Sequence, residues 1–540
     1  MRVPSSVRAG WLMPALLSGV LLTAGAAHAK PKESKPAPAA ESAPAAVVVP
    51  GAPDPKLRTQ TFADYESQLA SGQKARAADA LVAIVSDPAQ SPFHPEAYAK
   101  LGDLLLGLDL PYAATLAWRQ GFVLAQDWDA ETVGREVPKA IETAQKVGDI
   151  AVLQGPFSKN VGIARTEDVR GQMGYLAARE AFRQGSYGLS LGLLKLVKQG
   201  DPQFAQAKML EGIVLNQQSK PDTALTSFEA AGKAADKGSS AESKRFLEML
   251  KLNTGRSYYA SGNYPRAIQA FASVDRGSEF WPEAQFERAW AHFRIDDVNG
   301  TLGLLLSLDT PFFKTYYYPE ADLLRIYSMF MICKFPQANT EIDSFRAKYA
   351  KINDALKGWN GRSAEENFEA ARKYRQDGDA GALPAMFWRS YASEERFGSS
   401  VKAVESADAE LKRLKNVAAN PFSEWARTAV KARRSELVEL EGARIRDRIA
   451  AQQVEVDTML NDSQIFTLDI MAMKTKLYEQ AAASGKMPDV ARTAKRDERV
   501  KRTFVEWPYE GEVWADEVGY YKVNTAPECP ASLRTSVKGK

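Results

Sequence analysis

The chain has few of the residues that most often carry chemistry. Its 540 residues include three histidines and two cysteines, and its formal net charge at pH 7 is only +3. Loss of the N-terminal Arg2 and Arg8 would leave the rest of the chain almost neutral. General nucleic-acid binding needs a basic surface that displaces counterions from phosphates. We therefore expect no nucleic-acid partner.

Catalytic and metal-binding signatures are also missing. After the first 29 residues only His94 and His292 remain, and they lie far apart in the sequence. No spacing of histidines, cysteines and carboxylates indicates a zinc site. No nucleophile elbow, phosphate loop or dinucleotide fingerprint occurs. We therefore predict a protein that is not an enzyme and that holds no metal and no cofactor.

The two cysteines, Cys333 and Cys529, stand in unlike sequence contexts. An oxidising compartment would allow a disulfide between them, but neither their separation nor their surroundings favours one. A lone cysteine in a helical segment is more often a small buried hydrophobic residue. We favour that interpretation for Cys333 and leave the bridge as the alternative.

Residues 1–29 are typical of a secretory signal. Arg2 and Arg8 form a positive start, an apolar run follows, and the small residues Ala27 and Ala29 occupy the positions that signal peptidase reads. The alternative, a membrane anchor, is disfavoured because proline and glycine interrupt the run. We predict cleavage before Lys30. No later run approaches the ~20 apolar residues of a transmembrane helix, so we expect no membrane span after cleavage.

Residues 30–57 are rich in proline and alanine, with too little apolar surface to pack. We expect a disordered tether there.

The segment that follows the tether is different, because its apolar and small residues recur at a fixed period. The clearest unit is GRSYYASGNYPRAIQAF, residues 255–271. Gly255 is small where two helices would cross, Gly262-Asn263 suits a tight turn, and Phe271 is expected to fill the next interface.

The period identifies the architecture. A step of 34 residues maps Gly255 onto Ala289, and a further step of 37 maps Gly262-Asn263-Tyr264-Pro265 onto Cys333-Lys334-Phe335-Pro336. We expect about seven such units in residues 58–352, with gaps at 129–170 and 239–247. A pair of helices this short cannot bury its own apolar face, so stacked pairs form a superhelix. The predicted fold class is therefore an all-α solenoid of helical hairpins.

These motifs resemble the tetratricopeptide (TPR) repeat family. The resemblance implies a scaffold that binds other proteins in a concave groove lined by the first helix of each pair. Aromatic and arginine side chains are effective anchors in such a surface, although packing between helices is the alternative role for the aromatic ones. The candidate groove residues are Arg256, Tyr259, Trp290, Phe293, Arg294, Tyr327 and Phe330.

Residues 353–500 are predicted to form a C-terminal helical region. From 421 to 483 apolar residues recur at spacings of three and four, which predicts one or two long amphipathic helices, with Asn461-Asp462 as a break. Such a helix could pair with a partner in a coiled coil. We favour an intramolecular hairpin that packs on the end of the solenoid.

Residues 501–540 form an aromatic and acidic tail. Aromatic density of this kind either caps a core or docks a partner, and we favour capping. The segment WPYEGEVWADEVGYY looks like the ending of large secreted TPR proteins of deltaproteobacteria, some of them associated with the adventurous gliding-motility machinery of myxobacteria. The candidate tail residues are Trp507, Tyr509, Trp514, Tyr520 and Tyr521.

That second resemblance implies a periplasmic protein whose partners belong to an envelope-spanning or motility complex, with peripheral association at the outer membrane. Two other functions fit the same features. One is an accessory or activator protein of peptidoglycan synthesis or remodelling, and the other is an outer-membrane assembly chaperone.

Overall fold

The structure is a computed structural model that describes residues 55–125, 128–163, 166–485 and 511–528. The predicted signal peptide and most of the predicted tether lie outside these residues. All regular secondary structure in the described ranges is helical. The all-α class and the TPR-like arrangement of helical hairpins are therefore confirmed.

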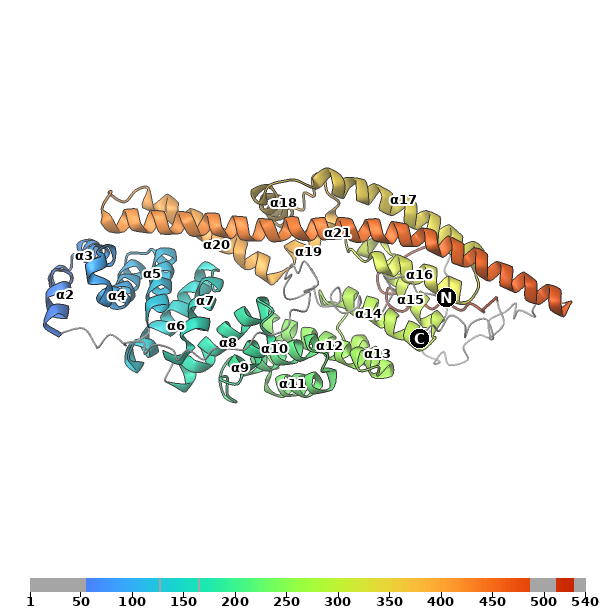
Figure 1. The fold of residues 1–540 in the computed structure, drawn as a ribbon, viewed down its shortest axis with the longest axis horizontal. Helices are drawn as coiled ribbons and strands as arrows, with labels where there is room; N and C mark the ends of the chain where they lie inside the picture. The colour runs from blue at the N-terminus through green and yellow to red at the C-terminus, as the bar shows by residue number, and fades with distance from the viewer. Residues whose placement is uncertain (1–54, 126–127, 164–165, 486–510, 529–540) are drawn as a thin grey trace, which may run out of the picture. The chain divides into compact units, whose positions relative to one another are not determined.

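The helices are named by their order in the chain (Figure 1). The ones that form pairs are α2 (Pro55–Ala70), α3 (Lys74–Ser86), α4 (His94–Gly107), α5 (Pro111–Leu124), α6 (Ala130–Val147), α7 (Ala151–Asn160), α8 (Glu167–Arg183), α9 (Tyr187–Leu194), α10 (Phe204–Gln217), α11 (Pro221–Ala234), α12 (Ala241–Ala260), α13 (Tyr264–Ala272), α14 (Trp281–Arg294), α15 (Val298–Leu308), α16 (Pro319–Met331) and α17 (Phe335–Trp359). They are followed by α18 (Ala364–Asp377), α19 (Ala385–Ala392), α20 (Glu395–Leu414) and α21 (Pro421–Ser484).

Successive helices from α2 to α17 form eight hairpins in the described residues, one more than the sequence analysis predicted. The additional hairpin, α6–α7, fills most of the expected gap at 129–170. Its repeat pattern is hard to recognise because Pro138 and Pro156 stand inside its helices. The first hairpin begins at Pro55, inside the segment predicted to be tether.

Every hairpin turns through one residue in the left-handed backbone region. In the unit that the sequence made clearest, this residue is Gly262, whose N–H donates to Tyr259 O, while Asn263 N–H donates to Tyr258 O. This pattern satisfies the last carbonyl groups of the first helix. Four turns use a non-glycine residue at some conformational cost. The eight turn residues are Gly72, Asp109, Gly148, Gly185, Ser219, Gly262, Asp296 and Cys333.

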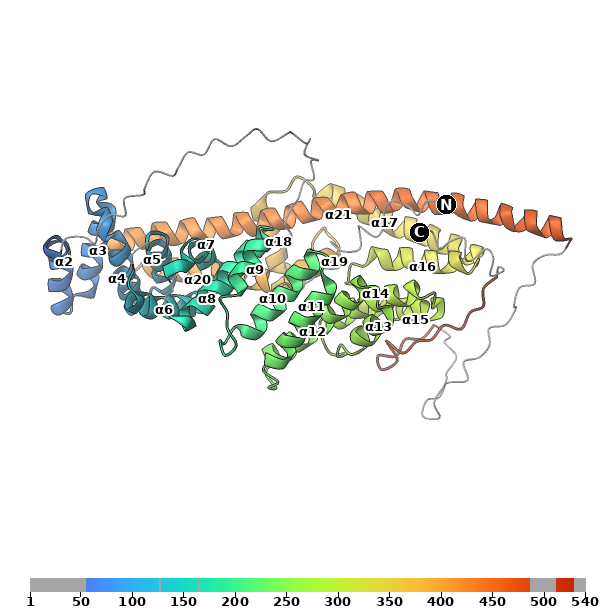
Figure 2. The same ribbon diagram turned by 60° about the horizontal axis from the view of Figure 1, so that its bottom comes forward.

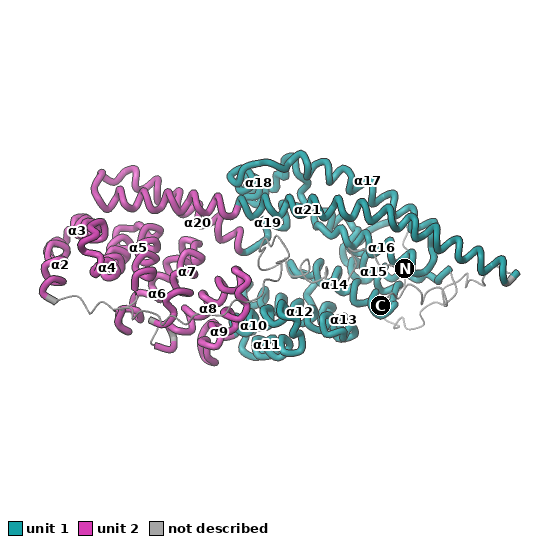
Figure 3. The backbone as a smooth tube through the Cα atoms, viewed as in Figure 1, with its two compact units in different colours: residues 1–21, 205–395, 442–540 teal, residues 22–204, 396–441 magenta. Residues whose placement is uncertain are grey.

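The chain divides into two compact units (Figure 3). Unit 2 takes its described residues from 22–204 and 396–441, and unit 1 takes them from 205–395 and 442–540. These units cut across the predicted domains 58–352 and 353–500. The helix α21 contributes its first part to unit 2 and the remainder to unit 1.

In unit 2, α20 and the start of α21 pack against the first hairpins. Glu410 on α20 accepts hydrogen bonds from the N–H groups of Tyr112 and Ala113, both at 2.8 Å, and so caps the start of α5. Arg433 on α21 makes a bidentate ion pair with Asp149, with N···O distances of 2.8 and 2.9 Å. These buried contacts fix α20 and α21 to the α4–α7 hairpins.

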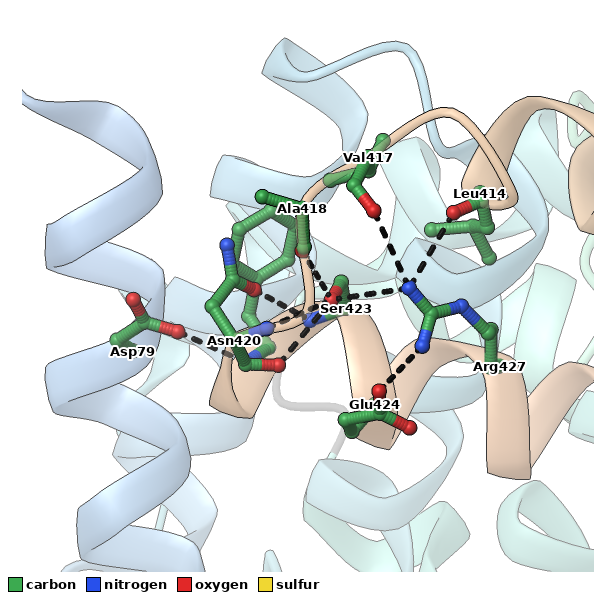
Figure 4. A network of polar contacts seen from close by, with 9 residues as sticks. Asp79, Leu414, Val417, Ala418, Asn420, Ser423, Glu424 and Arg427 are labelled. Carbon is green, nitrogen blue, oxygen red and sulfur yellow. Dashed lines mark hydrogen bonds and ion pairs between the residues drawn. The ribbon is translucent and has the colours of Figure 1, made fainter.

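The first turn of α21 is held by a polar network (Figure 4). Asn420 and Ser423 exchange hydrogen bonds between backbone N–H groups and side-chain oxygens, at 3.0 and 3.2 Å. Arg427 donates to the carbonyl oxygens of Leu414, the last residue of α20, and of Val417 in the loop that follows. Asp79 on α3 accepts from the N–H of Phe422 at 2.9 Å. The long helix therefore starts at a fixed place on unit 2.

In unit 1, α21 lies beside α16 and α17 in both views of the ribbon (Figures 1 and 2). Arg346 on α17 donates to the hydroxyl and carbonyl oxygens of Ser463, at 3.0 and 2.9 Å. The helix runs without interruption through Asn461 and Asp462, so the expected break is absent. It packs along hairpins in each unit rather than on the end of the last hairpin alone, which corrects the predicted placement.

Candidate protein-interaction surface

The seven candidate groove residues all lie on α12, α14 and α16, the first helices of their hairpins, as the repeat alignment predicted. Their environments differ. Arg256, Trp290 and Phe330 are buried, whereas Tyr259, Phe293 and Tyr327 are half-buried and Arg294 is exposed. Burial therefore separates side chains that build unit 1 from those that can meet a partner.

Arg256 has an internal role. Its guanidinium group contacts Glu287 and Glu283 on α14, with Nε–Oε1 2.9 Å to Glu287 and Nη2–Oε1 2.5 Å to Glu283. Burial raises the pKa of Glu287 to about 7, and the ion pair with Arg256 opposes that rise. The two carboxylates hold the pKa of Arg256 above its ordinary value, although burial acts against this. The cluster joins α12 to α14.

Tyr327 and Phe330 on α16 are covered by other parts of unit 1. The ring of Tyr327 meets Phe466 of α21 edge-on, with centroids 4.6 Å apart. Phe330 packs against Phe335 at the start of α17, with centroids 6.1 Å apart. Trp290 belongs to the apolar core between α14, α15 and α16.

Arg294 and three aromatic rings form a surface patch near the hairpin turns of α12–α13 and α14–α15. The guanidinium carbon of Arg294 lies 5.0 Å from the centroid of Tyr264, and Tyr264 meets Tyr259 edge-on at 5.3 Å. Phe293 packs with Tyr259 against the same apolar core as Trp290, and the exposed Ile295 follows Arg294 in the chain. We call these five residues the turn patch. The sequence analysis named Tyr264 as a repeat residue but missed its place in the site.

The described part of the tail packs on unit 1. Val518 is only 2% exposed and joins the apolar core that contains Phe271 and Trp281. Arg276, after α13, donates to the carbonyl oxygens of Ala515 and Asp516. The N–H of Gly519 donates to Ser307 Oγ at 3.0 Å. These contacts hold residues 511–528 against the α13, α14 and α15 region.

The described aromatic residues of the tail differ in exposure. Tyr521 is half-buried and packs on the same core as Val518. Trp514 and Tyr520 are 60% and 69% exposed. Trp507 and Tyr509 lie outside the described residues. Sequence reasoning did not identify Val518 as the buried anchor of this segment.

The structure corrects the favoured interpretation of Cys333. It is buried as expected, but it is disulfide-bonded, and it occupies a turn rather than a helix. Cys529, the other cysteine of the chain, lies outside the described residues. Adjacent contacts hold the tail close to this turn: Glu528 N–H donates to Ile332 O at 2.7 Å, and Lys334 Nζ pairs with Glu528 at 2.9 Å. The sequence separation of the two cysteines could not show that the tail packs beside a turn much earlier in the chain.

The histidines make local contacts. His292 Nδ1 lies 2.7 Å from Asp297 Oδ2 at the start of α15, and His94 Nε2 lies 3.0 Å from Asp87 O. Within the described ranges, no three histidine, cysteine or acidic side chains are grouped as a metal site requires. None of the helices in these ranges combines the length and the hydropathy of a membrane span.

Comparison with known proteins supports the repeat assignment. The tetratricopeptide repeat family model matches residues 175–239 and 252–298, which run from α8 to the first residue of α15. These two segments are similar to tetratricopeptide repeats. Repeats of this family generally serve as non-catalytic scaffolds for protein partners. No curated protein sequence matches the chain.

Three solved structures show a weak likeness, each at 13% identity. "Structure of Naa15/Naa10 bound to HypK-THB" is matched over 79% of this chain and 62% of that one, with a TM-score of 0.30. "Crystal Structure of P58(IPK) TPR Domain at 2.5 A" is matched over 70% and 98%, with a TM-score of 0.17. "Circular tandem repeat protein with novel repeat topology and enhanced subunit contact surfaces" is matched over 75% and 91%, with a TM-score of 0.15. This chain thus spans less than two thirds of the first structure, and these scores carry no argument about function.

Proposed function

We propose that this chain is a non-catalytic scaffold that binds a protein partner through the turn patch of unit 1. One observation carries the proposal. On tetratricopeptide repeats, Arg294 lies exposed over Tyr264, next to the half-buried Tyr259 and Phe293. Tyrosine and arginine are the side chains that most often supply the binding energy of protein interfaces.

The patch favours a partner segment that has apolar and acidic side chains. Ile295 and Phe293 offer apolar contact area, and Arg294 offers an exposed positive charge. An acidic group of the partner could approach the guanidinium group from the solvent side. The buried Arg256 cannot serve in this way, because its charge is already matched by Glu283 and Glu287.

Substitution and crosslinking test the binding surface. A photocrosslinking amino acid at Tyr264 should capture one or a few defined proteins in cells, and Arg294→Ala should weaken that capture about tenfold or more. The matched control is Arg76→Ala, which removes another exposed arginine on α3 in unit 2. Equal capture by the wild type and by the Arg294 variant would contradict the proposed surface.

We also propose a periplasmic location and a role in an envelope-spanning complex such as a gliding-motility machine. The predicted signal at residues 1–29 and the resemblance of the tail support this proposal. Fractionation tests it: the mature N-terminus should be Lys30, and the protein should be released with the periplasm. Captured partners should be envelope proteins. Retention of residues 1–29, or capture of cytosolic proteins alone, would contradict it.

The peptidoglycan and chaperone functions predict different results in the same assays. An accessory protein of peptidoglycan metabolism should sediment with purified sacculi. A chaperone should bind unfolded outer-membrane proteins and release them after folding. A scaffold should do neither and should retain its partner through repeated washing.

A further inference from the structure

The part of α21 that belongs to unit 1 has two stripes of residues with the same spacing. The inner stripe alternates steps of four and three residues, and every member is buried against unit 1. Its members are Gln452, Val456, Met459, Ser463, Phe466, Ile470 and Met473. A spacing that averages 3.5 residues is the seam that one helix presents to another over several turns.

The outer stripe follows the same rule and faces solvent. It contains no charged residue over more than three heptads, although α21 is rich in charge elsewhere. Val454, Ile465 and Leu468 are 62%, 43% and 64% exposed. At about 100° per residue, this stripe lies nearly opposite the inner one. Its members are Ala451, Val454, Thr458, Asn461, Ile465, Leu468, Ala472 and Thr475.

The polar members of the outer stripe suit burial against another helix. The hydroxyl of Thr458 donates to Val454 O at 2.8 Å, and that of Thr475 donates to Met471 O at 3.1 Å. Because both hydroxyls are satisfied within α21, a partner could cover them without the penalty of an unmade hydrogen bond. Asn461 is then the one seam residue with an amide to satisfy.

One flank of the stripe is uncharged from Gln464 onward. Gln464, Met471 and Tyr478 continue it sideways, and the last two are 58% and 62% exposed. An exposed apolar surface of this length on a soluble helix is characteristic of an interaction site. The partner must supply a helical seam of the same period and length.

We propose that the outer stripe pairs with the outer stripe of a second copy of this chain, in a parallel two-stranded coiled coil. The stripe is its own complement in period and length, and no other described helix exposes such a seam. In parallel register Asn461 meets Asn461 of the second copy, so two amides can bond to each other. A single polar pair of this kind fixes the register of a coiled coil at some cost in stability.

The flanking residues agree with this register. Residues that flank a parallel seam meet partners five positions along the other helix, so Gln464 faces the second copy's Asp469, and Met471 faces its Lys476. Neither of these two pairings opposes like charges. The same spacing brings Asp457 toward the second copy's Asp462, but Asp457 is engaged by Asn353 and Lys357 of α17, and Asp462 is buried against unit 1. The apolar stem of the lysine can cover the methionine while its ammonium group stays in water.

Sedimentation of the full mature chain tests the pairing. The wild type should be a dimer at micromolar concentration, and Ile465→Glu should raise the dimer dissociation constant at least about a hundredfold. Leu189→Glu is the matched control, because Leu189 is 52% exposed on α9 and lies outside both α21 and the turn patch. Circular dichroism should show that both variants are folded. A monomer at every concentration, a dimer that survives Ile465→Glu, or equal loss in the control would overturn the proposal.

Cysteine crosslinking tests the orientation. Leu468→Cys should form a covalent dimer under mild oxidation, because equivalent residues of a parallel seam face each other, whereas Leu189→Cys should not. Crosslinking at neither position, or at both, would contradict a parallel seam. If the protein is monomeric and the introduced thiol is shielded from a maleimide, another segment of the same chain covers the stripe and the proposal is wrong. Capture of a different protein by the thiol of a monomer would also contradict it.

Discussion

Phe271 lies on Gly255: a Cβ atom added to Gly255 would come within 2.5 Å of Cε1 of the phenylalanine ring. The two residues belong to α12 and α13 of one hairpin. The same relation joins Gly102 to Trp118 and Gly212 to Phe228, in each case between the two helices of a hairpin. A glycine in the first helix therefore admits an aromatic ring from the second, and the ring closes the hairpin core.

Gly255→Ala should destabilise unit 1 by about 1–3 kcal/mol, because the ring of Phe271 must leave its place in a packed core. Gly358→Ala provides the control: this glycine is exposed near the end of α17, and nothing lies within 4 Å of the added Cβ. The control should change stability by less than about 1 kcal/mol and in the favourable direction. Urea unfolding measures both. Similar losses for the two variants would show that the contact with Phe271 is unimportant.

The repeat pattern in the sequence predicted much of the fold because each position has a steric reason. Gly262 was aligned with Cys333, and both residues are left-handed turn residues in the structure. The ring of Phe271 was expected to fill the interface with the next hairpin, whereas it packs between the two helices of its own hairpin. Periodicity shows which face is apolar, but it does not show which neighbour that face meets. The α6–α7 hairpin was missed because interior prolines obscure its pattern.

The candidate site was less predictable. Arg256 and Arg294 both look like groove residues, and only the placement of Glu283 and Glu287 distinguishes a buried ion pair from an exposed anchor. The contacts of the tail join residues more than 200 positions apart, as in Gly519 with Ser307. No local pattern encodes such a contact. Exposure and long-range pairing therefore had to come from the structure.

Arg256→Met should cost about 3–5 kcal/mol in the free energy of unfolding, because it leaves the buried Glu287 without its cation. Arg294→Met should cost less than about 1 kcal/mol, because it removes only the contact with Tyr264 at the surface. Replacing both Arg256 and Glu287 with methionine should restore much of the loss, since the unpaired buried charge is gone. Chemical denaturation measures the free energy of unfolding of the three variants. No recovery in the double variant would mean that shape, rather than charge, determines the loss.

Ser219→Gly should stabilise unit 1 by about 0.5–1 kcal/mol. Ser219 has φ +58° in the turn between α10 and α11, a conformation that glycine adopts without strain. Ser261→Gly is the matched control, because Ser261 has φ −80° one residue before a left-handed glycine. At Ser261 the change to glycine should lower the stability of unit 1, since it only increases the conformational entropy of the unfolded chain. Thermal unfolding should move the two variants in opposite directions.

Stability should fall as pH rises from about 4.5 to about 8, owing in part to Glu320 and Glu455. Burial raises the pKa of both carboxyl groups. The charge of Glu320 raises the pKa of Glu455 further, whereas the hydrogen bond with Glu455 lowers the pKa of Glu320. The unfolded chain releases these protons at lower pH than the folded chain does, so the stabilising contribution is complete below the unfolded pKa and is lost above the folded one. Tyr317 donates to Glu455 at 3.3 Å.

Glu455→Gln should flatten this pH dependence, because the amide stays neutral and still accepts from Tyr317. Glu479→Gln, on an exposed part of the same helix, should leave the pH profile of the melting temperature unchanged. Differential scanning calorimetry across the pH range compares them. A profile that Glu455→Gln does not alter would assign the dependence to other buried groups, such as Glu287 and Glu410.

Gly519→Ala should release the tail from unit 1. Gly519 has φ +94°, and an added Cβ would lie 2.6 Å from the ring of Trp281, so the substitution meets both backbone strain and a steric clash. Gly511→Ala is matched, since Gly511 also has a positive φ but its Cβ would meet nothing within 4 Å. Hydrogen exchange of residues 511–528 should accelerate strongly in the first variant and little in the second, while the hairpins α12–α15 stay protected. Because the disulfide of Cys333 is intact in both variants, the comparison isolates the packing of Gly519. Equal exchange in the two variants would show that the contact with Trp281 does not hold the tail.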